Sequence, residues 1–84
     1  MVKLFAFKDL VVGSFDKYYV ARNREDALRI ARLSMQNYPF VGDLDLYMLA
    51  KVNSETGEVT PINPDFICHM TDLYSEVNDN EASA

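Results

Sequence analysis

All the arginines of this chain lie within eleven consecutive residues, which read RNREDALRIAR from position 22 to position 32. Guanidinium groups neutralise phosphates and tyrosine rings stack on bases, a combination used by proteins that bind single-stranded nucleic acid. We therefore define a candidate nucleic-acid-binding set from the cationic and aromatic side chains in and just before this segment. Its members are Lys17, Tyr18, Tyr19, Arg22, Arg24, Arg29 and Arg32. The same arginines also fit the solvated side of a helix, on which Glu25 and Arg29 would form an ion pair one turn apart.

The other reactive side chains do not predict catalysis. Cys68 and His69 are adjacent, but neighbouring residues of a strand point to opposite faces and no helical spacing brings them together. Asp43 and Asp45 are spaced to share one side of an extended strand and could hold a divalent cation or support acid-base chemistry, but a solvated strand start explains them better. The three glycines each fit a turn and form no phosphate-binding loop. We expect no enzyme activity, no metal site and no cofactor.

A helix from about Arg24 to Asn37 is expected to carry the arginines. Asn23 is placed to cap its first turn, and Pro39 ends it because proline cannot continue a helix. Leu33 falls on the polar flank of this helix. The apolar side consists of Ala27, Leu28, Ile30, Ala31 and Met35.

Strand patterns flank this helix on both sides. We predict strands at residues 2–12, 15–21 and 44–53 and a returning strand at 58–62, with turns at Gly13 and Gly57. The first strand is apolar on both faces, so we place it in the centre of a sheet or against a partner subunit. Pro61 confines the last strand to an edge, and a helical turn or two follows Asn63. The predicted class is α+β, a small, mainly antiparallel sheet in the order strand-strand-helix-strand-strand with one helix packed on it.

Composition and charge bound the class of protein. A single domain over residues 1–74 with an acidic, flexible tail at 75–84 accounts for the 84 residues. Residues 1–42 carry seven basic against four acidic side chains, a balance of +3, whereas residues 43–84 carry one against nine, a balance of −8. The acidic half would either fold back over the basic half, contact another copy head to tail, or only improve solubility.

Size and cysteine content indicate a cytosolic protein that self-associates. So short a chain buries little apolar surface by itself, which, with the doubly apolar first strand, predicts a homodimer or larger. One cysteine excludes an internal disulfide, and we expect a reducing compartment. The N-terminus lacks the features of a secretory signal, and no apolar run approaches the roughly 18 residues that span a bilayer.

Three segments of the chain resemble a known phage family. They read KLFAFKD at residues 3–9, YYVARNREDALR at 18–29 and DLYMLAKVNSETGEV at 45–59. They are similar to the small nonstructural protein of the gokushoviruses, tailless single-stranded DNA phages of the Microviridae, and the likeness covers about residues 1–62. Its most specific parts are N-x-x-x-A-x-R, formed by Asn23, Ala27 and Arg29, and the Leu46-Tyr47-x-Leu49 segment followed by Thr56-Gly57.

The resemblance implies a protein made in the host bacterial cytoplasm and absent from the mature virion. By analogy with the packaging protein of the phiX-type microviruses, it would help to switch replication to single-strand synthesis and packaging. We therefore expect a non-enzymatic accessory protein that contacts single-stranded viral DNA, or viral replication or procapsid proteins, through the arginine-rich helix face, with no membrane partner. The alternative is an oligomeric protein-interaction module whose acidic C-terminal half binds a basic viral or host protein.

Overall fold

The computed structural model describes residues 1–74, so the predicted tail at 75–84 lies outside the described residues. The elements follow the order β1 (Val2–Asp9), β2 (Ser14–Ala21), α1 (Arg24–Met35), the short 3-10 helix η1 (Val41–Asp43), β3 (Leu44–Val52) and β4 (Val59–His69). Residues 70–74 then form a short helix. The predicted α+β class, with one main helix on a small sheet, is confirmed.

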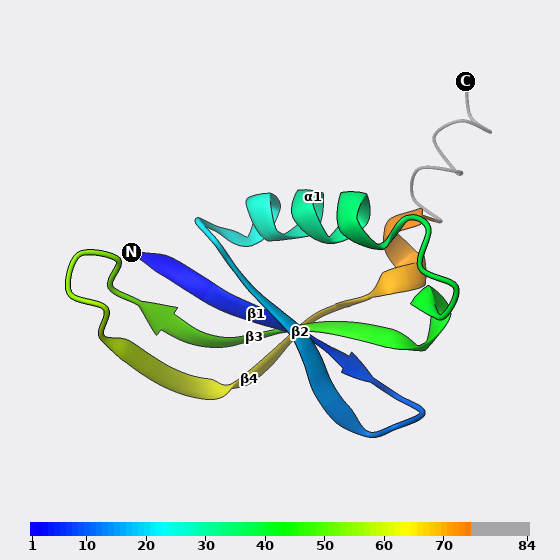
Figure 1. The fold of residues 1–84 in the computed structure, drawn as a ribbon, viewed down its shortest axis with the longest axis horizontal. Coiled ribbons are helices and arrows are strands. Elements are labelled where there is room, and N and C mark those ends of the chain that lie inside the picture. Colours follow the sequence, from blue (N-terminus) through cyan, green and yellow to red (C-terminus); the bar gives the residue numbers. More distant parts are fainter. Residues whose placement is uncertain (75–84) are drawn as a thin grey trace.

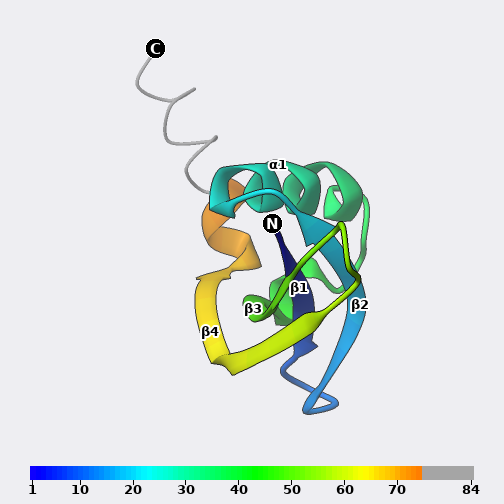
Figure 2. The same ribbon diagram turned by 90° about the vertical axis from the view of Figure 1, so that its left-hand side faces the viewer.

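The strands form one antiparallel sheet in the order β2-β1-β3-β4. The strand β1 lies between β2 and β3, as its doubly apolar pattern predicted, and β4 is an edge strand that accommodates Pro61. Since β2 and β3 are both antiparallel to β1, they run parallel to each other, and α1 connects them across β1. Figure 1 and Figure 2 show α1 lying along one side of the twisted sheet.

The turn between β1 and β2 begins earlier than the sequence predicted. One carboxylate oxygen of Asp9 accepts hydrogen bonds from the amides of Val11 and Val12 at 2.9 and 3.0 Å, which folds the chain back on itself. The amide of Gly13 also donates to the carbonyl of Asp9, and Gly13 has a positive φ of 84°. The strand predicted to reach Val12 therefore ends at Asp9.

The prediction of a helix directly after Asn63 is wrong for the residues up to His69, which form a strand. Residues 63–69 continue β4, because Asp65, Phe66 and Cys68 pair with successive positions of β3. Pairing between strands is not encoded in local turn signals, and here it overrides them. The helical turn begins only at Met70.

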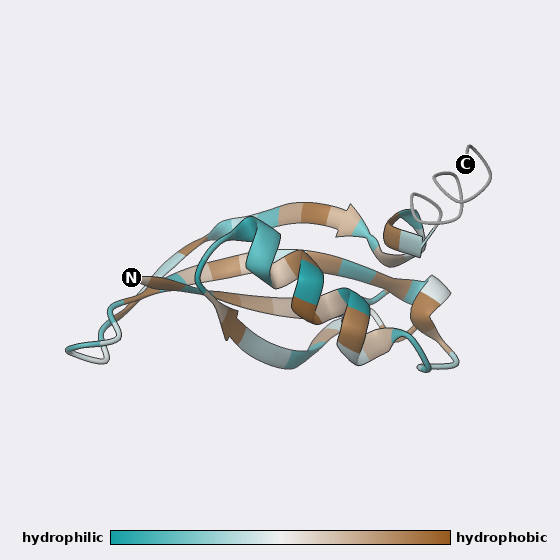
Figure 3. Ribbon diagram, turned by 90° about the horizontal axis from the view of Figure 1, so that it is seen from above, coloured by the Kyte–Doolittle hydropathy of each residue, from teal (hydrophilic) through white to brown (hydrophobic). Residues whose placement is uncertain are grey.

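The hydrophobic core lies between α1 and one face of the sheet. Phe5, Phe7 and Leu46 are fully buried there, and Ala27 and Ala31 of α1 let the helix approach the strands closely. The remaining buried members of the core are Ala21, Met35, Leu44, Ile67, Met70 and Leu73. Seen from above in Figure 3, α1 crosses the sheet with a hydrophilic start. Leu33 is exposed on the outer flank of α1, as its place in the helical pattern predicted.

The opposite side of the sheet is also apolar, and no described helix covers it. Because side chains alternate along a strand, Ala6 points away from the core that holds Phe5 and Phe7, and the pairing register places its neighbours on the same side. Figure 1 shows α1 and the helix at 70–74 on the other side. We call this side the open face. It consists of Val2, Leu4, Ala6, Lys8, Phe15, Val20, Asp45, Tyr47, Ala50, Val52, Val59, Pro61, Phe66 and His69.

Candidate functional site

The start of α1 is built around a capping asparagine. Asn23 has an extended backbone, and its side-chain oxygen accepts a hydrogen bond from the amide of Asp26 at 2.9 Å. This bond satisfies one of the amides that a first helical turn leaves unpaired. Glu25 and Asp26 follow in that turn, where the helix dipole favours negative charge. The predicted N-cap is confirmed.

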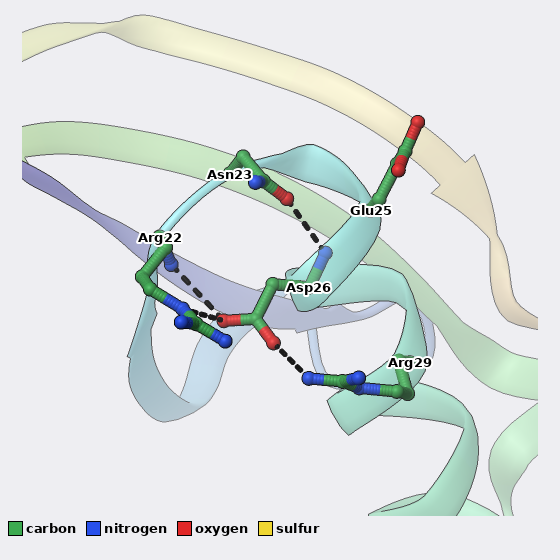
Figure 4. Close-up of a pocket in the computed structure, with 5 residues that line it drawn as sticks. All are labelled: Arg22, Asn23, Glu25, Asp26 and Arg29. Atoms are coloured by element: carbon green, nitrogen blue, oxygen red, sulfur yellow. Dashed lines mark hydrogen bonds and ion pairs between the residues drawn. The ribbon is translucent and has the colours of Figure 1, made fainter.

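Asp26 joins two of the arginines (Figure 4). It accepts a 3.2 Å hydrogen bond from the backbone amide of Arg22, whose Nε lies 3.6 Å away, and a 2.7 Å bond from Nη2 of Arg29. The pKa of the Asp26 carboxyl lies below its ordinary value chiefly because of the hydrogen bond from the Arg22 amide. Burial acts in the opposite direction, and the guanidinium groups of Arg29 and Arg22 lower the pKa further. The sequence predicted an ion pair between Glu25 and Arg29. In the structure Glu25 points away (Figure 4), and Arg29 pairs with Asp26 instead.

The four arginines form a largely solvent-facing surface, which we call the arginine surface. The side chains of Arg22 and Arg29 are 76% and 62% exposed although they are bound to Asp26, which is only 12% exposed. Arg22 and Arg29 line one pocket of about 360 Å³, and Arg29 and Arg32 line a second of about 200 Å³. Arg24 and Arg32 form no ion pair with another described residue, so their charges face solvent.

The structure places the other cation of the predicted set at the opposite end of the helix. Lys17 lies in a bulge of β2 with a φ of 55°, and its Nζ is 4.8 Å from the centre of the Tyr38 ring and 3.4 Å from Asp16. It lines a pocket with Ile30 and Met35 rather than with the arginines. The structure therefore does not bring Lys17 together with the arginine surface.

The two predicted tyrosines have different environments. Tyr18 is 59% exposed and lines the same pocket as Lys17. Tyr19 stacks on Phe5 and Phe7 at 5.7 and 5.8 Å, and its hydroxyl donates a 2.8 Å hydrogen bond to the carbonyl of Ala27. Burial raises the pKa of Tyr19. Its ring packs against the core, so Tyr18 is the more exposed of the two tyrosines.

Two lysines that the sequence analysis did not include lie near the start of α1. Lys3 and Lys51 are directly opposite each other on β1 and β3, and Lys3 also pairs with Ala21, the last residue of β2 before Arg22. Like charges opposite one another destabilise a sheet, so this pair adds positive charge at a cost to the fold. The alternation of side chains along each strand shows which face each lysine occupies. Only the pairing register shows that the two lysines lie opposite each other.

Neither Cys68 with His69 nor Asp43 with Asp45 forms a pair in the structure. Nδ1 of His69 lies 2.6 Å from Asp45 on the open face, whereas Cys68 packs against the core on the opposite side of β4. Asp43 belongs to η1 and lines a pocket with Asp9, so it does not pair with Asp45. Within residues 1–74, no cluster of three metal-binding side chains occurs. No helix in that range is both long and apolar enough to cross a bilayer.

The comparisons with known proteins identify a phage family. No curated protein and no solved structure matches the chain. A family described as Phage ORF5 protein matches residues 2–73, a range that includes all four strands, α1, η1 and the whole arginine surface. The chain therefore belongs to the Phage ORF5 protein family.

Proposed function

We propose that this phage protein is a non-enzymatic accessory factor of viral single-stranded DNA synthesis and packaging, which acts in the host cytoplasm. It contacts viral DNA, or the replication complex on that DNA, through the arginine surface. The observation that carries the proposal is the gathering of four exposed guanidinium groups, one just before α1 and three along it, in a chain whose net charge is −5. Such a local cationic surface attracts phosphates in spite of the acidic total.

Asp26 binds both Arg22 and Arg29, an arrangement that we call the clamp at Asp26. The clamp supports phosphate contact because it positions two of the four guanidinium groups before a phosphate binds. Arg22 and Arg29 are each held on one side by the carboxylate while their other donors face solvent. A guanidinium that is already positioned loses less side-chain entropy when it binds a phosphate. Asp26 offsets part of the local positive charge, so the net attraction depends most on Arg24 and Arg32, which form no ion pair with a described acidic residue.

The motif that supports the resemblance has structural roles in this fold. Asn23 caps α1, Ala27 is fully buried and its carbonyl accepts the Tyr19 hydroxyl, and Arg29 binds Asp26. Substituting any of these residues would disturb the helix as well as a DNA contact. Arg24 and Arg32 are therefore the positions at which binding can be tested separately from folding.

The test measures binding of a fluorescein-labelled oligo(dT) by anisotropy across a series of salt concentrations. We expect the affinity of the wild type to fall steeply with salt, and the double variant Arg24→Gln/Arg32→Gln to bind more weakly with a salt slope smaller by about 1 to 2. The matched control is Asn37→Glu/Ser54→Glu, which lowers the net charge by the same amount at two exposed sites away from the arginine surface. Its affinity should fall much less.

Two results would contradict the proposal. An absence of wild-type binding at low salt would exclude direct DNA contact, and an equal loss in the control would show that only total charge matters. In the first case, a protein partner that co-purifies after nuclease treatment and is lost on deletion of residues 72–84 would point to the alternative, an acidic interaction module.

A further inference from the structure

The open face carries a row of aromatic rings that the proposed DNA contact does not use. Tyr47 of β3 meets Phe15 of β2 and Phe66 of β4 edge to face, with ring centres 5.3 and 5.7 Å apart. Ala6 lies beneath this row and is fully buried, yet it does not belong to the core under α1. Phe66 remains 53% exposed, so a second apolar cluster is formed but left uncovered by the described residues.

We propose that two copies of this chain associate through their open faces, sheet against sheet. A sheet that is apolar on both faces requires a layer on each side, and α1 supplies only one of them. A second copy supplies the other, so that the dimer has four layers in the order helix, sheet, sheet, helix. This inference does not depend on the proposed DNA contact, which involves the opposite side of each copy.

The charges on the open face fit a second copy better than a nucleic acid. In a two-fold interface each patch meets itself, so a patch with net charge would repel its own copy. Lys8 and Asp45 oppose each other in the register and balance, Asp45 is bound to His69, and Nζ of Lys8 lies 5.9 Å from the centre of the Phe15 ring. The open face is therefore nearly neutral in a strongly charged chain, and one lysine offers little to a phosphate backbone.

The two edges of the sheet are poorly suited to association. On the β2 edge, Lys17 interrupts the strand with a bulge and a positive φ. On the β4 edge, Pro61 and Pro64 each lack the amide hydrogen that an added strand would need. Such features prevent edge-to-edge pairing of sheets, so the face, and not an edge, is the surface through which copies can meet.

The area of the open face is sufficient for a dimer. Four strands about 4.8 Å apart and eight residues long cover roughly 500 Å² in projection. Two such faces would bury about 1,000 Å² or more, which is near the lower limit for specific interfaces. We therefore expect a reversible dimer whose population depends on concentration.

The test is sedimentation equilibrium of the full chain over a wide range of concentrations. The wild type should approach twice the monomer mass of 9.6 kDa, and Phe66→Glu should remain a monomer with a dissociation constant raised at least about tenfold. The matched control is Phe40→Glu. Phe40 is also an exposed phenylalanine, 58% against 53%, and it meets one tyrosine edge to face at 5.8 Å. It lies off the open face, so this control should dimerise like the wild type.

Circular dichroism of each variant establishes whether it folds. If Phe66→Glu does not fold, Val20→Lys on the opposite edge strand takes its place, since Val20 is exposed on the same face and should give the same folded monomer. A wild type that stays at 9.6 kDa at every concentration overturns the proposal. So does a dimer lost in Phe40→Glu but retained in Phe66→Glu, or a monomer whose Tyr47 and Phe66 NMR signals shift with oligo(dT).

Discussion

Two tyrosines on opposite faces of the sheet have similar aromatic neighbours and different surroundings. Tyr19 stacks on Phe5 and Phe7, with ring planes 24° and 29° apart, and α1 covers the group. Tyr47 meets Phe15 and Phe66 with ring planes 87° and 76° apart on the open face. The chain therefore builds two three-ring clusters, of which the described residues enclose only one. This separates the part that stabilises the monomer from the part available to a partner.

This division also explains where the charges lie. The helix that covers the Tyr19 cluster carries the arginine surface on its outer side, whereas the open face has only Lys8, Asp45 and His69 among apolar residues. Electrostatic contact and apolar contact are thus assigned to opposite sides of a small domain. In the proposed dimer the two arginine surfaces would lie on the outer sides, and both would be free to bind the same DNA.

The largest expected effect comes from truncating a ring in each cluster. Phe7 is 1% exposed, and Phe7→Ala should lower the free energy of unfolding by about 3 to 5 kcal/mol because it leaves a cavity under α1. Phe66→Ala should cost about 1 kcal/mol or less, since its ring is half in solvent and loses chiefly its contact with Tyr47. Urea unfolding followed by circular dichroism at low protein concentration measures both.

Equal losses of stability in Phe7→Ala and Phe66→Ala would contradict the distinction between a covered and an uncovered cluster. In that case the open face would be part of the monomer core, and its association would have to be explained differently. Repeating the measurement at high protein concentration sharpens the result, because a dimer interface adds stability that depends on concentration. Phe66→Ala should then lose more than it does at low concentration.

The sequence predicted most of the fold because most elements carry local signals. Asn23 marks the start of α1, and alternating residues mark β3. The prediction failed after Asn63, where asparagine and proline suggested a helix but the chain continues to pair with β3. The decisive interactions there join residues about twenty positions apart, and no local pattern reports them.

The candidate site was predicted in composition but not in geometry. The clustering of arginines is evident in the sequence, and the position of Arg24, Arg29 and Arg32 on one helix follows from its periodicity. The clamp at Asp26 and the burial of Tyr19 depend on how β2 leads into α1, which places Arg22 beside the first helical turn. The aromatic row of the open face required the strand order, since its members come from three different strands.

A smaller effect is expected from removing one hydroxyl from each tyrosine. Tyr19→Phe should lower the free energy of unfolding by about 1 kcal/mol, because the carbonyl of Ala27 then loses a partly buried hydrogen bond. Tyr47→Phe should change it by a few tenths of a kcal/mol at most, since the Tyr47 hydroxyl bonds to no described residue. Equal losses in urea unfolding would mean that the two clusters do not differ in the way proposed.

The smallest effect is expected at Asp26, the carboxylate that binds Arg22 and Arg29 at the start of α1. The pKa of Asp26 is lower in the folded chain than its ordinary value of 3.8, so its charged form stabilises the fold above about pH 4. This contribution is lost as the pH falls through the folded value. Asp26→Asn should therefore be less stable than the wild type at pH 7, and the difference should shrink below about pH 4 in urea unfolding at stepwise pH.

Asp16→Asn is the control: the pKa of Asp16 is also lowered, chiefly by the Lys17 amide, but its side chain is 73% exposed, so solvent screens the interaction. A pH dependence in Asp16→Asn that matches Asp26→Asn would show that the clamp at the start of α1 adds no more stability than an ordinary surface ion pair.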